Sequence, residues 1–352
     1  MTQERLEVIG GVDTHGRTHH AAVIDSAGRL LGDGEFAATA AGYRSLLEWL
    51  AGFGTVGKVG VEGTGTYGAG LARYLTRSGV AVVEVDRPDR KTRRSKGKSD
   101  PIDAIAAARA VLAGTATGTP KTRTGPVEAI RVLRVARRGA VKARTAALNQ
   151  IHGLLASAPE DLREGLRGLS ATEIVAKAAA FRIDTSRLDQ PTEATRAALR
   201  AIARRVQALD EEIALADARI NPAIRAAAPA TMALFGVGPQ VASQLVVTAG
   251  DNPERLRDDA ALAHLCGIAP LPASSGRTDR HRLNRGGDRQ ANNAVHTIVL
   301  CRMKYDARTR AYVERRVAQG LGKSEIIRCL KRYIVREIHS ALIADFNRPI
   351  TT

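Results

Sequence analysis

Four acidic residues stand where their carboxylates could hold a metal ion. Asp13 ends the apolar segment EVIGGVD, Glu62 ends another apolar segment, and Asp100 and Asp103 open an Ala-rich segment three residues apart. If the two apolar segments are neighbouring strands, their acids project at adjacent strand ends, and a helix packed nearby brings the other pair to the same point. Hard oxygen ligands of this kind suit Mg²⁺. Two such ions can activate an attacking oxygen and stabilise a leaving oxygen in phosphodiester chemistry.

Each acid taken alone also has an ordinary structural explanation. Asp100, Pro101 and Asp103 fit the N-cap, N1 and N3 positions of a helix start. An Asp that follows a strand, as Asp13 does, is commonly a turn residue. The joint pattern favours the metal site: acids end two strands of a unit of three strands, a helix and a strand, and an acidic pair follows. This is the layout of an RNase H-like nuclease.

Histidines and cations surround these acids in the sequence. His15, His19 and His20 lie close to Asp13, and we expect a local polar role for them because Mg²⁺ prefers oxygen ligands. The run 87–98, RPDRKTRRSKGK, holds seven Lys/Arg and one Asp directly before the acidic helix. A charge run is often only a solvated surface, but cations beside an acidic site are useful if phosphates lie between them. The nucleic-acid contacts expected here are Arg93, Arg94, Lys96 and Lys98.

Apolar periodicity predicts an α/β fold for the first third of the chain. The expected strands cover 7–13, 20–25, 29–36, 58–61 and 80–85, and the expected helices cover 42–50, 69–78 and 101–112. Three strands in succession followed by crossovers indicate a mixed sheet with helices on its faces.

The rest of the chain reads as helical. One helix is indicated by Ile130, Leu133 and Val141, and 148–155 could extend it; a second covers 196–220. The two form either a helical arm, as in a coiled-coil hairpin, or a compact bundle, and the sequence leaves both open. Further helices are expected at 290–303 and 324–346, with loops at 274–276 and 285–287. We therefore divide the chain into a catalytic domain (1–118), a helical arm (119–222) and a mostly α-helical C-terminal domain (223–352).

Composition narrows the class of protein. With 53 Lys+Arg against 36 Asp+Glu, the formal charge is +17, which predicts a polyanionic partner. Three widely spaced cysteines support neither a zinc ribbon nor a disulfide framework. Aromatic residues are 3%, which disfavours a single-strand binder that stacks bases on many rings and favours recognition through backbone phosphates and grooves. No apolar run or leader indicates a membrane span or a signal peptide, so a cytoplasmic protein is expected.

Motifs in both halves of the chain resemble a known family. GVDTH (11–15), GVEGTGTYG (60–68) and KSDPIDA (98–104) look like the DEDD motif of insertion-sequence transposases related to the Piv pilin-gene invertase. FGVGPQVASQLVVTAGD (235–251), the segment 262–292 and GLGKSEIIRCLKR (320–332) look like the second domain of that family. The resemblance implies a RuvC-like N-terminal domain, which is an RNase H variant, with Mg²⁺ held by Asp13, Glu62, Asp100 and Asp103.

The same resemblance implies a nucleophile and partners. A family serine that forms a covalent phosphoserine link to DNA maps to Ser275, with Ser274 as its neighbour, and works in a composite site built from two protomers. Members join donor and target duplexes under the guidance of a structured noncoding bridge RNA. The expected partners are thus double-stranded DNA, a guide RNA and further copies of the chain, as a dimer or tetramer, in the bacterial cytoplasm at the nucleoid. The alternative is a hydrolytic Holliday-junction resolvase that uses the DEDD site alone.

Further nucleic-acid contacts are expected in the last third. Gly236 and Gly238 resemble the turn of a helix–hairpin–helix, which exposes backbone N–H groups to a phosphate. Cations that follow Ser275 could hold the scissile phosphate, and a further lysine lies in the family's last motif. These expected contacts are Arg277, Arg280, Arg282, Arg285 and Lys323.

Overall fold

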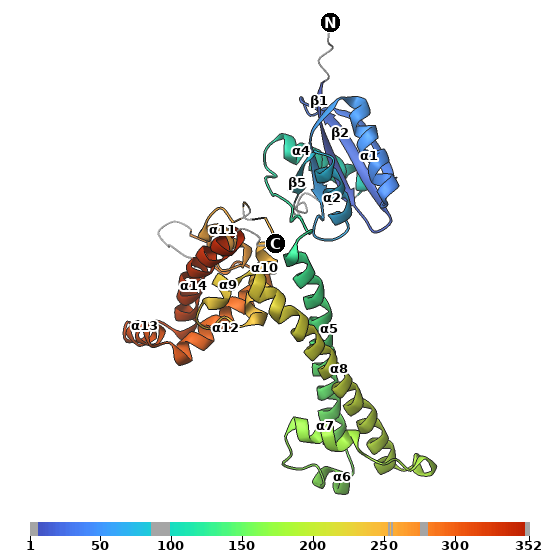
Figure 1. Cartoon of the computed structure of the whole chain (residues 1–352), viewed down its shortest axis with the longest axis vertical. Coiled ribbons are helices and arrows are strands. Elements are labelled where there is room, and N and C mark those ends of the chain that lie inside the picture. The colour runs from blue at the N-terminus through green and yellow to red at the C-terminus, as the bar shows by residue number, and fades with distance from the viewer. Residues whose placement is uncertain (1–5, 86–98, 253, 255, 275–280, 349–352) are drawn as a thin grey trace. The chain divides into compact units, whose positions relative to one another are not determined.

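The computed structural model describes residues 6–85, 99–252, 254, 256–274 and 281–348 (Figure 1). The chain forms two compact units. One comprises Met1–Gly125 and Ala249–Arg257, and the other comprises Pro126–Thr248 and Asp258–Thr352. In broad terms the chain is a mixed α/β part followed by a helical part, as expected.

The first unit is built on a five-stranded sheet in the order β3-β2-β1-β4-β5. The strand β1 is antiparallel to β2 and parallel to β4, and β4 is parallel to β5, so the sheet is mixed as predicted. This arrangement is consistent with an RNase H-like transposase domain. The elements of this unit are β1 (Glu7–Thr14), β2 (Thr18–Asp25), β3 (Leu30–Ala37), α1 (Ala40–Phe53), β4 (Thr55–Glu62), α2 (Ala69–Arg77), β5 (Ala81–Val85) and α4 (Asp100–Leu112).

Helices cover both faces of this sheet. On one face, Leu46 and Leu50 of α1 and Leu71 of α2 pack against valines of β1 and β4, among them Val12 and Val61. Residues that alternate with those valines point to the opposite face, where α4 packs. Because side chains alternate between the two faces, α4 packs against Gly11 and Gly60, the neighbours in sequence of Val12 and Val61.

A short segment from late in the chain completes the first unit. Asp251 accepts hydrogen bonds from the backbone N–H groups of Arg123 (3.4 Å) and Gly125 (3.2 Å). Asn252 donates to the carbonyl oxygen of Pro120 at 3.2 Å. Arg123 has a φ of 53°, a backbone conformation rare for a residue with a side chain, so these bonds hold an otherwise unfavourable turn. Asp251 and Asn252 thus hold the segment that ends at Gly125 through hydrogen bonds to its backbone.

The second unit contains the two long predicted helices as an antiparallel hairpin (Figure 1). Arg137 of α5 (Pro126–Ala156) donates to Asp217 of α8 (Pro191–Ala227) at 2.6 Å, and further along α5 Arg144 pairs with Asp210. The partner number falls as the α5 number rises, so the helices run in opposite directions. Where α5 ends and α8 begins, α7 packs against α8, and the buried cluster at this end of the hairpin includes Ile151, Val175 and Leu199.

Helices α9, α11, α12 and α13 of the second unit pack against α14, and α13 also packs against α12. The buried apolar faces of α12 and α14 include Ile298, Ile334 and Ile338. No helix within the described ranges is long and apolar enough to cross a membrane. The elements of the unit are α5 (Pro126–Ala156), α6 (Glu160–Glu164), α7 (Ala171–Ala179), η1 (Thr185–Arg187), α8 (Pro191–Ala227), α9 (Pro229–Ala233), α10 (Pro239–Ala249), α11 (Asp259–Leu265), β6 (Leu271–Pro272), β7 (His281–Arg282), α12 (Arg289–Tyr305), α13 (Ala307–Ala318) and α14 (Lys323–Phe346).

Candidate active site and nucleic-acid-binding residues

Asp13 and Glu62 lie at the same level of two adjacent strands. The strands β1 and β4 are parallel neighbours, and their register pairs Val12 with Val61, the residues that precede the two acids. Both acids are buried, with exposed fractions of 6% and 7%. The Thr14 hydroxyl donates to the carbonyl oxygen of Glu62 at 2.8 Å and ties the two strand ends together. The first and fourth strands are therefore neighbours, which is the condition under which their two acids meet at one edge of the sheet.

Two glycines bring the acidic helix against these strands. A β-carbon on Gly11 would lie 2.2 Å from the carbonyl oxygen of Ala104 in α4, and one on Gly60 would lie 3.0 Å from that of Ala107. Gly11 and Gly60 stand two residues before Asp13 and Glu62, so each glycine shares a sheet face with its acid. A Gly-x-acid pattern in both strands was the available sequence signal for this close approach.

Asp100 and Asp103 occupy the first turn of α4. The N-cap is Ser99, whose side chain makes no capping hydrogen bond; the sequence placed Asp100 at that position, one residue too late. Asp103 is buried, with an exposed fraction of 6%, on the helix side that also buries Ala104 and Ala107. The positive end of the helix dipole stabilises negative charge here. The helix start therefore places two carboxylates beside the strand ends.

His15 joins the acidic cluster, where the sequence indicated only a local polar role. Its Nδ1 lies 3.8 Å from Oδ2 of Asp13, and its Nε2 lies 3.8 Å from Oδ1 of Asp100. One ligand atom from each of these three residues lies within 4.8 Å of the others. Two carboxylates and an imidazole form a donor set that fits a divalent cation. Glu62 and Asp103 lie outside this group of three but are buried on the same side of the sheet.

The expected contacts in the second unit are only partly described. Gly236, with a φ of 82°, and Gly238 form the turn between α9 and α10. Arg282, Arg285 and Lys323 are exposed. The other expected site residues lie outside the described residues: Ser275, Arg277 and Arg280, and in the first unit Arg93, Arg94, Lys96 and Lys98.

Comparisons with known proteins match two parts of the chain to transposase families. Residues 10–158 match a family of DEDD transposases named for IS110, and residues 228–314 match a family described as transposase IS116/IS110/IS902. A Streptomyces coelicolor protein described as the mini-circle transposase for IS117 is 26% identical over an alignment of 332 positions, gaps included, that covers 79% of this chain and 80% of that protein. A 42 kDa protein of insertion element IS900 from Mycobacterium paratuberculosis is 28% identical over 134 residues, 37% of this chain and 34% of that protein.

Proposed function

Because this chain carries the IS110-family transposase domains and is a DNA transposase, we propose that it cuts and joins DNA strands at a divalent-metal site formed by Asp13, Glu62, Asp100 and Asp103. The observation that carries the proposal is the burial of three of these carboxylates where α4 meets the ends of β1 and β4. Mg²⁺, the ion proposed for this oxygen-rich set, would supply a Lewis acid that polarises the scissile phosphate.

The protein's own residues hold that site in place. Gly11 and Gly60 admit α4, and the first turn of α4 carries Asp100 and Asp103. His15 lies between the carboxylates of Asp13 and Asp100, where its ring orients both side chains or serves as a further ligand. Carboxylate oxygens and an imidazole nitrogen are ligands suited to holding a divalent cation.

We further propose that Ser275 is the nucleophile. Its Oγ forms a bond to the scissile phosphorus and loses its proton, while the bond from phosphorus to the leaving deoxyribose oxygen breaks and that oxygen takes a proton. The resulting phosphoserine keeps the energy of the phosphodiester for rejoining. The family resemblance supports this role, a RuvC-like fold, a composite site in a dimer or tetramer, and a bridge RNA that selects donor and target DNA.

A suicide DNA substrate tests the chemistry. With Mg²⁺, the wild-type protein should form an adduct that resists SDS and is destroyed by protease. Asp13→Asn and Ser275→Ala should form none, whereas Ser274→Ala, the matched neighbour, should form it normally. Strand exchange by Ser275→Ala at the wild-type rate would overturn the nucleophile. Mg²⁺-dependent cleavage without any adduct would identify the hydrolytic resolvase instead.

Guidance by RNA has a separate test. RNA that co-purifies with the protein from its host should be a discrete transcript of the element's end, and RNase treatment should abolish strand exchange. Recovery of only ribosomal fragments, with full activity after RNase, would refute guidance and leave the strand chemistry untouched.

A further inference from the structure

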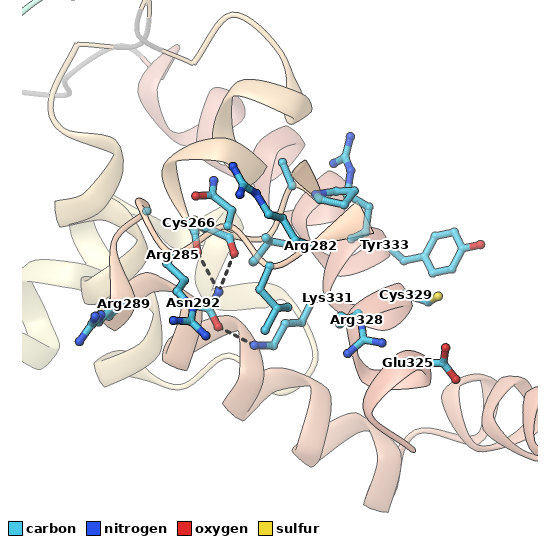
Figure 2. Close-up of a pocket in the computed structure, with 18 of the residues that line it drawn as sticks. Cys266, Arg282, Arg285, Arg289, Asn292, Glu325, Arg328, Cys329, Lys331 and Tyr333 are labelled. Atoms are coloured by element: carbon cyan, nitrogen blue, oxygen red, sulfur yellow. Dashed lines mark hydrogen bonds between the residues drawn. The ribbon is translucent and has the colours of Figure 1, made fainter. Parts of the chain in front are cut away.

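A cationic pocket lies in the second unit, among residues distinct from the carboxylate cluster (Figure 2). Its volume is about 1210 Å³, and its walls are the segment after α11, the segment that joins β7 to α12, and one side of α14. This volume exceeds the roughly 300–1,000 Å³ of an ordinary small-molecule site. The pocket is therefore large enough for a stretch of polymer.

Most cations of this pocket form no ion pair with the carboxylates that the structure describes. Arg332 pairs with Asp259 at 2.6 Å, and Arg336 lies 3.4 Å from the same carboxylate. Glu325, the one carboxylate of the lining, accepts the backbone N–H of Gly322 at 2.9 Å. The lining cations that form no ion pair with a carboxylate of the described residues are Arg282, Arg285, Arg289, Arg328 and Lys331. Such an excess attracts an anion with several charges.

Lys331 is held in place at the pocket wall before any ligand arrives. Its Nζ donates to Oδ1 of Asn292 at 2.6 Å, and Nδ2 of Asn292 donates to the carbonyl oxygens of Cys266 (3.0 Å) and Gly267 (3.1 Å), as the dashed lines in Figure 2 show. Burial lowers the pKa of Lys331 because the ammonium is partly removed from water. A phosphate at this position would offset that desolvation.

An aromatic platform adjoins the cations. Tyr333 is 49% exposed on α14, and its ring meets that of Tyr312 edge-on at 5.7 Å. The guanidinium of Arg336 lies 5.8 Å from the centre of the Tyr333 ring. In Figure 2 the ring points away from Asn292 and Lys331, so it stands at the rim. An exposed ring beside cations can stack on a base whose face is open.

We propose that this pocket binds an unpaired stretch of nucleic acid, with phosphates on Lys331 and the arginines and a base stacked on Tyr333. A duplex is disfavoured because its bases are already stacked and paired, which leaves Tyr333 without a base face to meet. This inference rests on the proposed function in one respect, which is that the polyanion bound by the pocket is a nucleic acid. Either RNA or locally melted DNA could supply this unpaired strand, because both present phosphates and open base faces.

Binding of short oligonucleotides to the full-length protein tests the proposal. The probes are a single-stranded DNA, an RNA of the same sequence and the corresponding duplex, each with one 2-aminopurine whose fluorescence falls on stacking. Tyr333→Leu should abolish the fluorescence change and weaken single-strand binding by about 5- to 150-fold. Tyr333→Phe should keep both. Lys331→Gln or the exposed Arg328→Gln should reduce the logarithmic salt dependence by about 0.7.

Tyr305→Leu is the matched control, because Tyr305 is 62% exposed but does not line the pocket. The proposal is overturned if Tyr333→Leu and Tyr305→Leu behave alike, or if the duplex binds as tightly as the single strands and responds equally to the variants. The single strand that binds more tightly, DNA or RNA, identifies which of the two nucleic acids the pocket takes. Asp13→Asn should retain single-strand binding, so a failure of the strand chemistry is distinguishable from a failure of this pocket.

Discussion

Gly11 of β1 lies so close to Ala104 of α4 that a β-carbon on the glycine would be 2.2 Å from the Ala104 carbonyl oxygen. That β-carbon would also be 2.3 Å from the backbone nitrogen of Ala108. Backbone atoms within a helix cannot move aside to relieve such a clash, whereas the end of a flexible side chain can. This contact therefore sets how near the first turn of α4, with Asp100 and Asp103, comes to Asp13.

Gly11→Ala should push α4 off the sheet. We expect a loss of at least about 1–3 kcal/mol in the free energy of unfolding, the usual cost of overpacking, and loss of adduct formation. Urea denaturation and the suicide substrate measure the two effects. Gly52→Ala is the matched control, because a β-carbon there meets nothing within 4 Å and the helix α1 gains about 0.5–1 kcal/mol. Equal stability of the two variants would contradict the role of Gly11.

Asp345 of α14 caps α9 from outside that helix. Its carboxylate accepts the backbone N–H groups of Ala230 (2.7 Å) and Thr231 (2.9 Å) and the Thr231 hydroxyl (2.6 Å). Asp345→Ala should cost roughly 2–4 kcal/mol, since it leaves buried donors without acceptors. Asp210→Ala, which removes an exposed pair with Arg144, should cost at most about 1 kcal/mol. Similar shifts of the denaturation midpoint for the two variants would argue against this cap.

Arg134 joins α5 to α10 through a buried polar network. Its guanidinium donates to the backbone carbonyl of Gln240 at 2.9 Å and to the side chains of Ser243 and Gln244, and burial lowers its pKa to about 10. Arg134→Met should destabilise the protein by at least about 2 kcal/mol, because it removes the donor to Oε1 of Gln244 and the charge-assisted bonds to Gln240 and Ser243.

Arg134→Lys should recover little of that stability, since an ammonium cannot reproduce the fork of the guanidinium. The exposed Arg138→Met on the same helix is the control and should remain near wild type. Full recovery by lysine would show that charge, and not hydrogen-bond geometry, matters at this position.

The burial of His19 should make the first unit less stable in acid. The ring is fully buried against Tyr43, its Nδ1 lies 3.0 Å from the carbonyl oxygen of Thr18, and its Nε2 has no hydrogen-bond partner among the described residues. Burial lowers the pKa of His19 below its ordinary value of 6.5, and the nearby His15 adds to this lowering. The unfolded chain therefore takes up the proton more readily than the folded chain.

This contribution to stability should be complete above pH 6.5 and should be lost as the pH falls from 6.5 toward the lowered pKa. Urea denaturation at pH 7.5 and pH 5.5 measures the loss. His19→Asn, whose amide can still donate to Thr18, should flatten that part of the pH dependence, whereas His152→Asn on the exposed side of α5 should not. An unchanged pH dependence in His19→Asn would exclude His19 as the cause.

The order of helices and strands can be predicted from the sequence because each element's apolar periodicity depends only on residues near one another in the chain. The eight predicted elements of the first unit all occur, with ends that differ by a few residues. Local pattern was less informative where tertiary packing overrides it: α8 continues through Pro222 to Ala227 instead of ending at 220. The helix α13 carried too weak an apolar stripe to be predicted, with Thr309 as its one buried residue.

The sequence by itself determined which acids stand at strand ends and at a helix start, and hence that a metal site was to be expected. The tertiary structure decided that β1 and β4 are neighbours, that α4 packs on the glycine face, and that His15 joins Asp13 and Asp100. It also decided that Asn292 holds Lys331, 39 residues away, at the wall of a cationic pocket. Periodicity reports which side of an element is buried, but the residues that meet across elements depend on packing between segments far apart in the chain.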